Sequence, residues 1–389
     1  MKARAATSRI AAGLSTDPVS ANAAVEAARQ ASEEIQGEVD LAFLFLTPHH
    51  LDSAAAAAHM LREELAPRTL LGCVAEGVLA GDREIEQGPA LAVWAGSLPG
   101  AEIEPFHASA VEAGESVEIV GFPDPATAQL IAVLVDPFTF PAGLLLSYLN
   151  EEHPGLPVVG GMAAGGAAPR AQALIVDGEV YDEGAAGALV SGVSVLTVVS
   201  QGCSPIGQDA VVTGAEGNIV FELAGRPALE RLRDEIEALP PDRQRLAAGG
   251  ILAGLVIDEN RSEYRRGDYL MRGVLGADQR SGAIALGEQV RVGQTLRFHV
   301  RDAFSADEDL NEALASALGG VEAAGALLFT CNGRGTRMFP EPDHDAKTVA
   351  QALASPALGG IFCAGEIGPV GGAAFLHGFT ATLAIFLAS

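Results

Sequence analysis

The side chains with the clearest chemical potential lie near the C-terminus of this 389-residue sequence. Cys331 ends an apolar run and opens the loop Asn332-Gly333-Arg334-Gly335, whose backbone N–H groups could hold an oxyanion or a carboxylate. An arginine next to a thiol favours the thiolate if it points inward, which makes Cys331 a candidate nucleophile. A cysteine at the end of an apolar strand is more often a small buried hydrophobic residue, and the sequence favours this second interpretation.

A second group of candidates follows the next apolar run. Glu366 stands in a turn between Gly365 and Gly368. A carboxylate buried there needs a partner, which could be Arg334 or the ammonium group of a ligand. An exposed turn acid fits the sequence equally well. His377, on the hairpin that borders this turn, could supply a hydrogen bond or an iron ligand.

The two groups are expected to meet at one edge of a sheet. The two strands of a β-α-β unit run parallel, so the loop 331–335 and the turn 365–368 emerge at the same carboxyl edge. Arg334 and Glu366 would then offer one cationic and one anionic contact, which suits a zwitterion such as an amino acid. The same two residues could instead pair with each other.

Other chemistries lack their motifs. No glycine pair is followed by the Lys of a phosphate-binding loop, no G-x-G-x-x-G lies between a strand and a helix, and no G-x-S-x-G is present. The four cysteines form no C-x-x-C pair, and no metal site is predicted. Haem needs only one axial histidine and an apolar slot, so the sequence leaves haem open. The candidate axial ligands are His49, His50, His107 and His377.

The elements that must position these side chains form a unit that recurs three times. Each copy has an apolar run of strand length, a helix, a second strand with two glycines five positions apart, and a hairpin that leads into a closing strand. The opening strands are expected at 41–46, 130–135 and 326–331, and the helices at 53–65, 141–152 and 345–353. The glycine pairs are Gly72/Gly77, Gly160/Gly165 and Gly360/Gly365, and Gly249/Gly254 shows the same spacing at a fourth, degraded place.

This repeat predicts an α/β fold in which β-α-β-hairpin units form mixed sheets with helices packed on their outer faces. A charged helix, 227–239, begins after Gly225, and we place a domain boundary there. The sequence therefore predicts two related halves, domains 1–225 and 226–389. In the first copy, Glu76 and Gly77 are expected to approach a cleft shared with the second copy's segment 160–165.

Composition narrows the class of protein. The chain has 24 Lys and Arg against 50 Asp and Glu, a formal net charge of −26, so nucleic acid and anionic membranes are not expected as partners. Hydrophobic residues make up 49% of the chain, enough to form a buried core. No export signal or long apolar span is expected, and four cysteines are too few to staple a fold of this size. A cytoplasmic protein is therefore predicted.

Three separated segments in the C-terminal part, 331–335, 360–369 and 375–381, together resemble the C-terminal half of FIST-domain proteins. Segments 71–77 and 221–229 are similar to the N-terminal half of the same family, so the resemblance spans nearly the entire chain. It implies a sensory, ligand-binding module in signal transduction, with small ligands such as amino acids or, in some members, haem for sensing nitric oxide. No attached kinase, cyclase, chemoreceptor or F-box segment is expected, and the output is expected to pass through a separate signalling protein.

The sequence thus predicts a cytoplasmic sensor that binds a small ligand and is not an enzyme. A haem-based gas sensor, a Cys331-dependent enzyme and an interaction module without a ligand are the alternatives. No catalytic residue and no metal ligand is assigned. The predicted ligand-binding residues are Cys331, Asn332, Gly333, Arg334, Gly335, Gly365, Glu366, Gly368, His377, Glu76 and Gly77.

Overall fold

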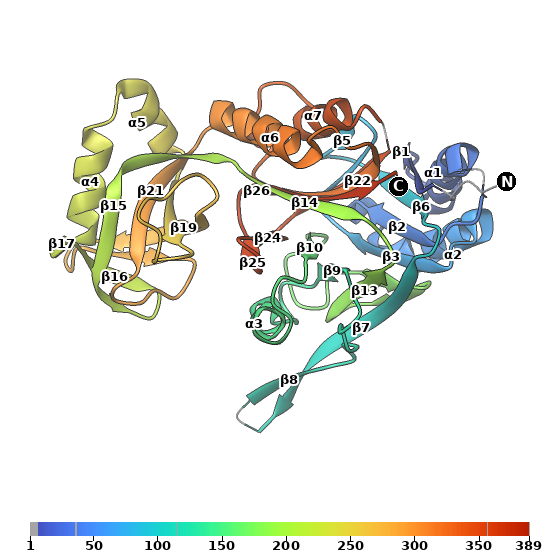
Figure 1. The fold of residues 1–389 in the computed structure, drawn as a ribbon, viewed down its shortest axis with the longest axis horizontal. Coiled ribbons are helices and arrows are strands. Elements are labelled where there is room, and N and C mark those ends of the chain that lie inside the picture. The colour runs from blue at the N-terminus through green and yellow to red at the C-terminus, as the bar shows by residue number, and fades with distance from the viewer. Residues whose placement is uncertain (1–6, 36, 115, 356, 389) are drawn as a thin grey trace. The chain divides into compact units, whose positions relative to one another are not determined.

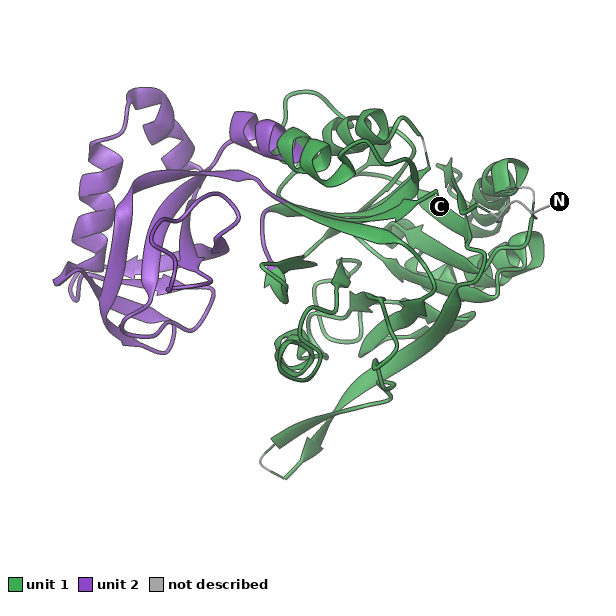
Figure 2. Ribbon diagram, viewed as in Figure 1, with its two compact units in different colours: residues 1–199, 311–376, 380–389 green, residues 200–310, 377–379 purple. Residues whose placement is uncertain are grey.

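The computed structural model describes residues 7–35, 37–114, 116–355 and 357–388 (Figure 1). The fold is mixed α/β with mixed sheets, as the sequence predicts. The chain divides into two compact units (Figure 2): unit 1 holds Met1–Val199, Asn311–Leu376 and Thr380–Ser389, and unit 2 holds Ser200–Leu310 and His377–Phe379. The boundaries of these units do not fall between residues 225 and 226, and the division into domains 1–225 and 226–389 stays a prediction.

Unit 1 contains the three copies, apart from residues 377–379 of the third, and each copy has the order strand, helix, parallel strand, hairpin and closing strand. The first copy consists of β2 (Leu41–Leu46), α2 (Ala54–Leu65), β3 (Thr69–Val74), β4 (Gly77–Ala80), β5 (Arg83–Ile85) and β6 (Leu91–Ser97). The second consists of β9 (Leu130–Val135), α3 (Ala142–Glu152), β10 (Val158–Met162), β11 (Leu174–Val176), β12 (Glu179–Tyr181) and β13 (Ala185–Ser191). The third consists of β22 (Ala323–Cys331), α7 (His344–Leu353), β23 (Leu358–Cys363), β24 (Glu366–Val370), β25 (Ala373–His377) and β26 (Thr380–Leu387).

The hairpin of each copy joins the sheet of another copy. β4 of the first copy pairs with β23 of the third, β11 of the second pairs with β3 of the first, and β24 of the third pairs with β10 of the second. Each of the three sheets is therefore built from two copies. The repeat pattern in the sequence does not reveal this exchange, which brings the turn of the first copy to the sheet of the third.

The first glycine of each pair allows two parallel strands to approach. Gly72, Gly160 and Gly360 each lie opposite a residue of the opening strand of the same copy. A Cβ atom at any of the three would overlap the facing carbonyl oxygen. Gly254 has a different setting, because β18 (Ile251–Val256) is antiparallel to its neighbours and a Cβ there would meet the ring of His299. The fourth glycine pair is therefore not a further copy of the unit.

The inner faces of the three sheets of unit 1 share one apolar core. Side chains alternate along a strand, so every second residue of the opening strands points into this core, among them Phe43, Leu134 and Phe329. The opposite face of the first sheet packs on α1 (Ser20–Ile35) and α2, and that of the second sheet packs on α3. The predicted position of helices on the outer faces is confirmed for these two sheets.

Unit 2 contains an antiparallel sheet of seven strands, six of which form a barrel, and the short β17 (Arg226–Pro227) pairs with β16 alone. Its helices are α4 (Ala228–Glu237), α5 (Pro241–Ala248) and the first part of α6 (Ala303–Leu318). Its strands follow one another in the order β15, β21, β18, β19, β20 and β16, and β16 pairs with β15 to close the ring. Closure satisfies backbone groups that an open edge would leave unpaired. The strands of this ring besides β18 are β15 (Cys203–Glu216), β21 (Thr295–Arg301), β19 (Tyr269–Asp278), β20 (Ala283–Leu286) and β16 (Ile219–Leu223). Within the described ranges, no helix has the length and apolar character needed to span a membrane.

Candidate ligand-binding site

The loop that follows β22 is held at the carboxyl edge of the third sheet. Cys331 lies in register with Cys363, the last residue of the parallel strand β23. The backbone N–H of Asn332 donates to the carbonyl oxygen of Cys363 at 2.9 Å, and the N–H of Arg334 donates to that of Cys331 at 2.8 Å. The two strand ends therefore meet at one edge, as the β-α-β pattern predicts.

Arg334 is fully buried and forms an ion pair within the protein. Its Nε and Nη2 donate to the two carboxylate oxygens of Asp345 at 2.7 and 2.8 Å, and the Thr330 hydroxyl donates to Asp345 at 2.7 Å. Burial alone would raise the pKa of Asp345, but the Arg334 charge and these hydrogen bonds hold that pKa well below its usual range. The expected pairing of Arg334 with Glu366 or with a ligand is thus replaced by a bidentate pair with Asp345. We find no sequence signal for this partner beyond its place in the first turn of the predicted helix.

Glu366 is fully buried, which excludes the alternative of an exposed turn acid. It accepts hydrogen bonds from the backbone N–H and the hydroxyl of Thr380 at 3.1 and 2.8 Å, and it is hydrogen-bonded to the thiol of Cys331. Burial raises the pKa of Glu366 to about 8 against the opposing effect of the Thr380 hydrogen bonds. At neutral pH this carboxyl group is therefore mostly protonated. Cys331, Arg334 and Glu366 form one electrostatically linked cluster.

Glu84, which the sequence did not single out, fixes the first copy's hairpin to the third copy. It lies on β5, and one carboxylate oxygen accepts the N–H of Ala346 at 2.8 Å in the first turn of α7. Its own N–H donates to the Asp343 carboxylate at 2.8 Å. Burial, and then the charge of Asp345, raise the pKa of Glu84 to about 8. This reciprocal contact holds β4 and β5 against α7.

A small open pocket lies between that hairpin and the loop after β22. Its volume is about 90 Å³, and it is lined by Glu76, Gly77, Glu86, Gln87, Asn332, Thr336, Arg337 and Phe362. Thr336 donates its N–H and its hydroxyl to the two carboxylate oxygens of Glu86 at 2.8 and 2.9 Å. Arg337 pairs with Glu76 and also donates to the Asn332 carbonyl at 2.8 Å. The pocket therefore combines carboxylates of the first copy with a cation of the third.

Comparison with known protein families shows to which family the chain belongs. Residues 40–226 match the FIST N domain, and residues 228–369 match the FIST C domain. The chain belongs to the FIST family. It is 45% identical over 383 residues to an uncharacterized protein of Mycobacterium tuberculosis. This alignment covers 97% of this chain and all of the relative. An uncharacterized protein of Mycobacterium bovis is 45% identical over 384 residues, covering 97% of this chain and 99% of the relative. FIST domains are generally linked to sensory signal transduction.

The pocket is thus formed by both FIST domains, and it contains three of the predicted site residues. Glu76, Gly77 and Asn332 line it. Glu76 pairs with Arg337 in the loop of the third copy. Segment 160–165 packs close to the strand that precedes Glu76, because a Cβ at Gly165 would meet the Val74 side chain, and Gly165 donates its N–H to the Gln172 side chain at 2.8 Å. A cleft that this segment shares with Glu76 and Gly77 stays a prediction. Glu86, Thr336 and Arg337 were missed, because only the exchange of hairpins brings them together.

The predicted glycines of the FIST C domain serve mainly the packing of the backbone. Gly335 has a φ of 55° and opens a short 3-10 helix, and a Cβ there would meet the Glu86 carboxylate at 2.6 Å. Gly368 leaves no room for a Cβ against Val199 and Thr382. The Gly333 N–H points to the Cys331 sulfur at 3.4 Å, and the Gly365 carbonyl accepts the Met162 N–H at 2.8 Å. Their assignment as ligand-binding residues stays a prediction.

The residues of the haem and enzyme alternatives are not among those that line this pocket, although Cys331 directly precedes Asn332. The His50 ring is buried beside the Ser20 hydroxyl at 2.9 Å, and the His107 ring stacks on Tyr181 and contacts the Glu183 carbonyl. His377 is buried and is grouped with unit 2. In the part of the chain that the structure describes, no group of three His, Cys, Asp or Glu side chains is arranged to hold a metal ion. Haem binding and Cys331 chemistry stay predictions.

Proposed function

We propose that this FIST protein is a sensor whose pocket between the β4–β5 hairpin and the loop after β22 binds a small zwitterion such as an amino acid. The observation that carries the proposal is the charge arrangement of the pocket. Arg337 supplies a cation, and Glu76 and Glu86 supply anions, all within one cavity of about 90 Å³. A free amino acid presents a carboxylate and an ammonium group at a similar short separation.

The ligand's carboxylate would bind Arg337, and its ammonium group would bind Glu76 or Glu86. The Arg337 and Glu76 side chains are 56% and 38% exposed, so their pairing contributes at most about 1 kcal/mol and is easily displaced. The cavity holds the equivalent of about three water molecules, so it fits the backbone part of an amino acid or a whole glycine-sized ligand. A larger side chain would extend out through the pocket's open mouth.

Ligand binding would tie the two FIST domains together. The pocket walls come from a hairpin anchored by Glu84 and from a loop anchored by the buried Arg334–Asp345 pair. A ligand that touches both walls binds the folded state only, and it therefore raises the free energy of unfolding. This coupling would provide the signal of a sensor.

Thermal melts with a panel of the common amino acids test the proposal. At a ligand concentration about 100 times its Kd, the stabilisation is about 2.7 kcal/mol, or a rise of several degrees in Tm. Arg337→Ala should remove this response. Arg170→Ala is the matched control, because Arg170 is also exposed and also paired with a glutamate, Glu183, but lies outside the pocket. The proposal is wrong if no amino acid raises Tm, or if both variants respond as the wild type does.

A further inference from the structure

The second copy differs from the first in how its outer face is covered. In the first copy, α1 precedes the opening strand and packs beside α2, with Ala23, Ala27 and Ala31 fully buried. In the second copy, residues 102–129 precede the opening strand. Apart from the undescribed position 115, they form β7 (Glu102–Ala113), β8 (Ser116–Val120) and an irregular stretch, with no helix. The second sheet therefore has α3 on this face without a companion helix.

A groove of about 490 Å³ lies beside α3 in this place. It is lined by Ile119, Phe122, Pro123, Asp124, Leu144, Leu145 and Tyr148. Phe122 packs edge-on against Phe106 in the apolar layer under α3, whereas Leu144 and Tyr148 are each 44% exposed. An open groove with apolar walls in a monomeric protein commonly marks a site of interaction. In the first copy, two helices cover the corresponding face of the sheet. The groove lies next to the single helix α3, so a second helix could bind there.

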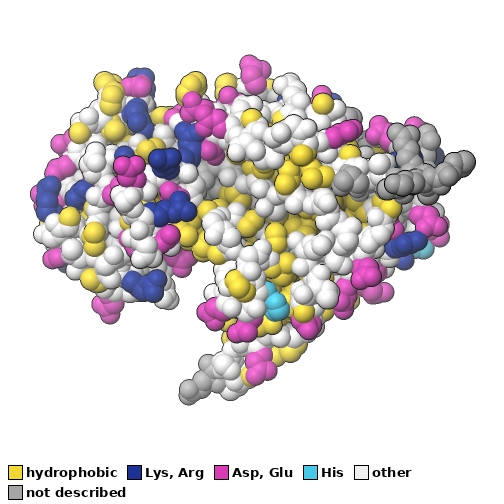
Figure 3. Space-filling view, in the orientation of Figure 1, with side chains coloured by type: hydrophobic (Ala, Val, Ile, Leu, Met, Phe, Trp, Pro, Cys, Tyr) yellow, Lys and Arg dark blue, Asp and Glu magenta, His cyan; other side chains and the backbone are white. Residues whose placement is uncertain are grey.

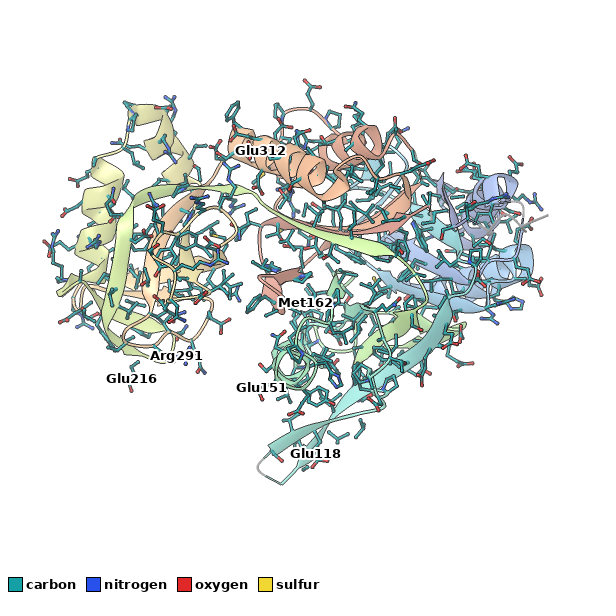
Figure 4. All side chains as sticks on the ribbon, viewed as in Figure 1. Glu118, Glu151, Met162, Glu216, Arg291 and Glu312 are labelled. Atoms are coloured by element: carbon teal, nitrogen blue, oxygen red, sulfur yellow. The ribbon has the colours of Figure 1, made fainter. Side chains whose placement is uncertain are left out.

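The surroundings of the groove are acidic. No Lys or Arg occurs from Glu84 to Pro169, whereas this stretch holds eleven Asp and Glu. Asp124 lies in the groove itself, and Glu118 and Glu151 stand on the flanking β8 and α3 (Figure 4). On the face that Figure 3 shows, acidic and apolar side chains and a histidine, but no Lys or Arg, gather around α3 and β8. A basic partner is attracted to such a surface, and a second copy of this chain, with its net charge of −26, is repelled.

We propose that this groove is a docking site for a basic amphipathic helix of a separate protein. The apolar stripe of the helix lies against Phe122, Leu144 and Tyr148, and its Lys and Arg side chains face Asp124 and the acids on both flanks. The helix takes the place beside α3 that α1 takes beside α2. This surface lies entirely in unit 1 and does not depend on the ligand pocket.

A peptide-binding experiment with the full chain tests this proposal. The probe is a fluorescent peptide of about 16 residues with leucines at i, i+3, i+4 and i+7 spacing and lysines elsewhere; a scrambled peptide of the same composition is its control. Fluorescence anisotropy should show binding of the amphipathic peptide that weakens with added salt, and clearly weaker binding of the scrambled one. Leu144→Lys should weaken the amphipathic peptide's binding at least tenfold. Leu275→Lys is the matched control, since Leu275 is 69% exposed and lies in unit 2.

Three outcomes would overturn the proposal. The first is no binding of the amphipathic peptide up to about 1 mM, or equal binding of both peptides. The second is equal binding by the Leu144→Lys and Leu275→Lys variants. The third is a reversible dimer, seen by sedimentation, that Leu144→Lys abolishes, because the occupant would then be a second copy. Leu144 is substantially exposed, so an unchanged melting temperature will show that its variant is folded.

Discussion

Replacing Arg334 by alanine should strongly destabilise unit 1 even without any ligand. The substitution leaves the carboxylate of Asp345 at a position with no exposed side-chain surface, where hydrogen bonds with Thr330 and His344 remain but the cation is gone. Removing one partner of a buried ion pair costs about 3–5 kcal/mol, because the remaining charge is desolvated without compensation. This is a large part of the roughly 5–15 kcal/mol that stabilises a typical domain, and it corresponds to a fall in Tm of about 10 °C.

The single tryptophan makes this effect measurable in unit 1 alone. Trp94 is fully buried in the core of unit 1, with its ring 5.1 Å from that of Phe386. Urea unfolding followed by Trp94 emission therefore reports on this core, while circular dichroism reports on the whole chain. A double variant, Arg334→Met with Asp345→Leu, should recover much of the loss, because two apolar side chains leave no unpaired charge.

The exposed pair of Arg170 and Glu183 provides the comparison. Their side chains are 66% and 41% exposed, so Arg170→Ala should cost less than about 1 kcal/mol. If Arg334→Ala unfolds at the same urea concentration as Arg170→Ala, the ion pair does not hold the loop as inferred. The loop's anchoring, on which the pocket's geometry depends, would then need another explanation.

Two further predictions concern the strand packing and the buried carboxyl group. Gly360→Ala should strongly lower the urea concentration at which Trp94 emission reports half-unfolding, because the new Cβ overlaps the Leu328 carbonyl. Gly143→Ala is the control, because its Cβ enters open space on α3, and it should be neutral or slightly stabilising. Equal effects of the two substitutions would contradict the packing argument. Glu366 holds its proton up to about pH 8 in the folded state and only to about 4.5 when unfolded, so its contribution to stability is complete below pH 4.5 and is lost as the pH rises through 8. Glu366→Gln should therefore reduce the fall in the free energy of unfolding between pH 5 and 8 by at most about 5 kcal/mol, as measured by urea titrations at several pH values. If the free energy of unfolding of this variant falls with pH as steeply as that of the wild type, the carboxyl group is not protonated as described.

The copies themselves could be predicted from the sequence because their signals are local. Apolar runs of strand length, helices of matching length and a glycine at the same place in each second strand all lie within one copy. The glycine is needed because the neighbouring parallel strand comes too close for a Cβ, and both strands belong to the same copy. For the same reason the loop after Cys331 and the end of β23 could be placed at one edge.

Which residues come together at the candidate site could be learned only from the tertiary structure. Backbone hydrogen bonds between strands carry no side-chain signature, so nothing in the sequence shows that β4 pairs with β23 and brings Glu76 and Glu86 to Arg337. Burial is likewise a property of the whole fold. It decides that Arg334, the arginine favoured by the sequence, is fully buried and pairs with Asp345, while the side chain of Arg337, three residues later, is 56% exposed.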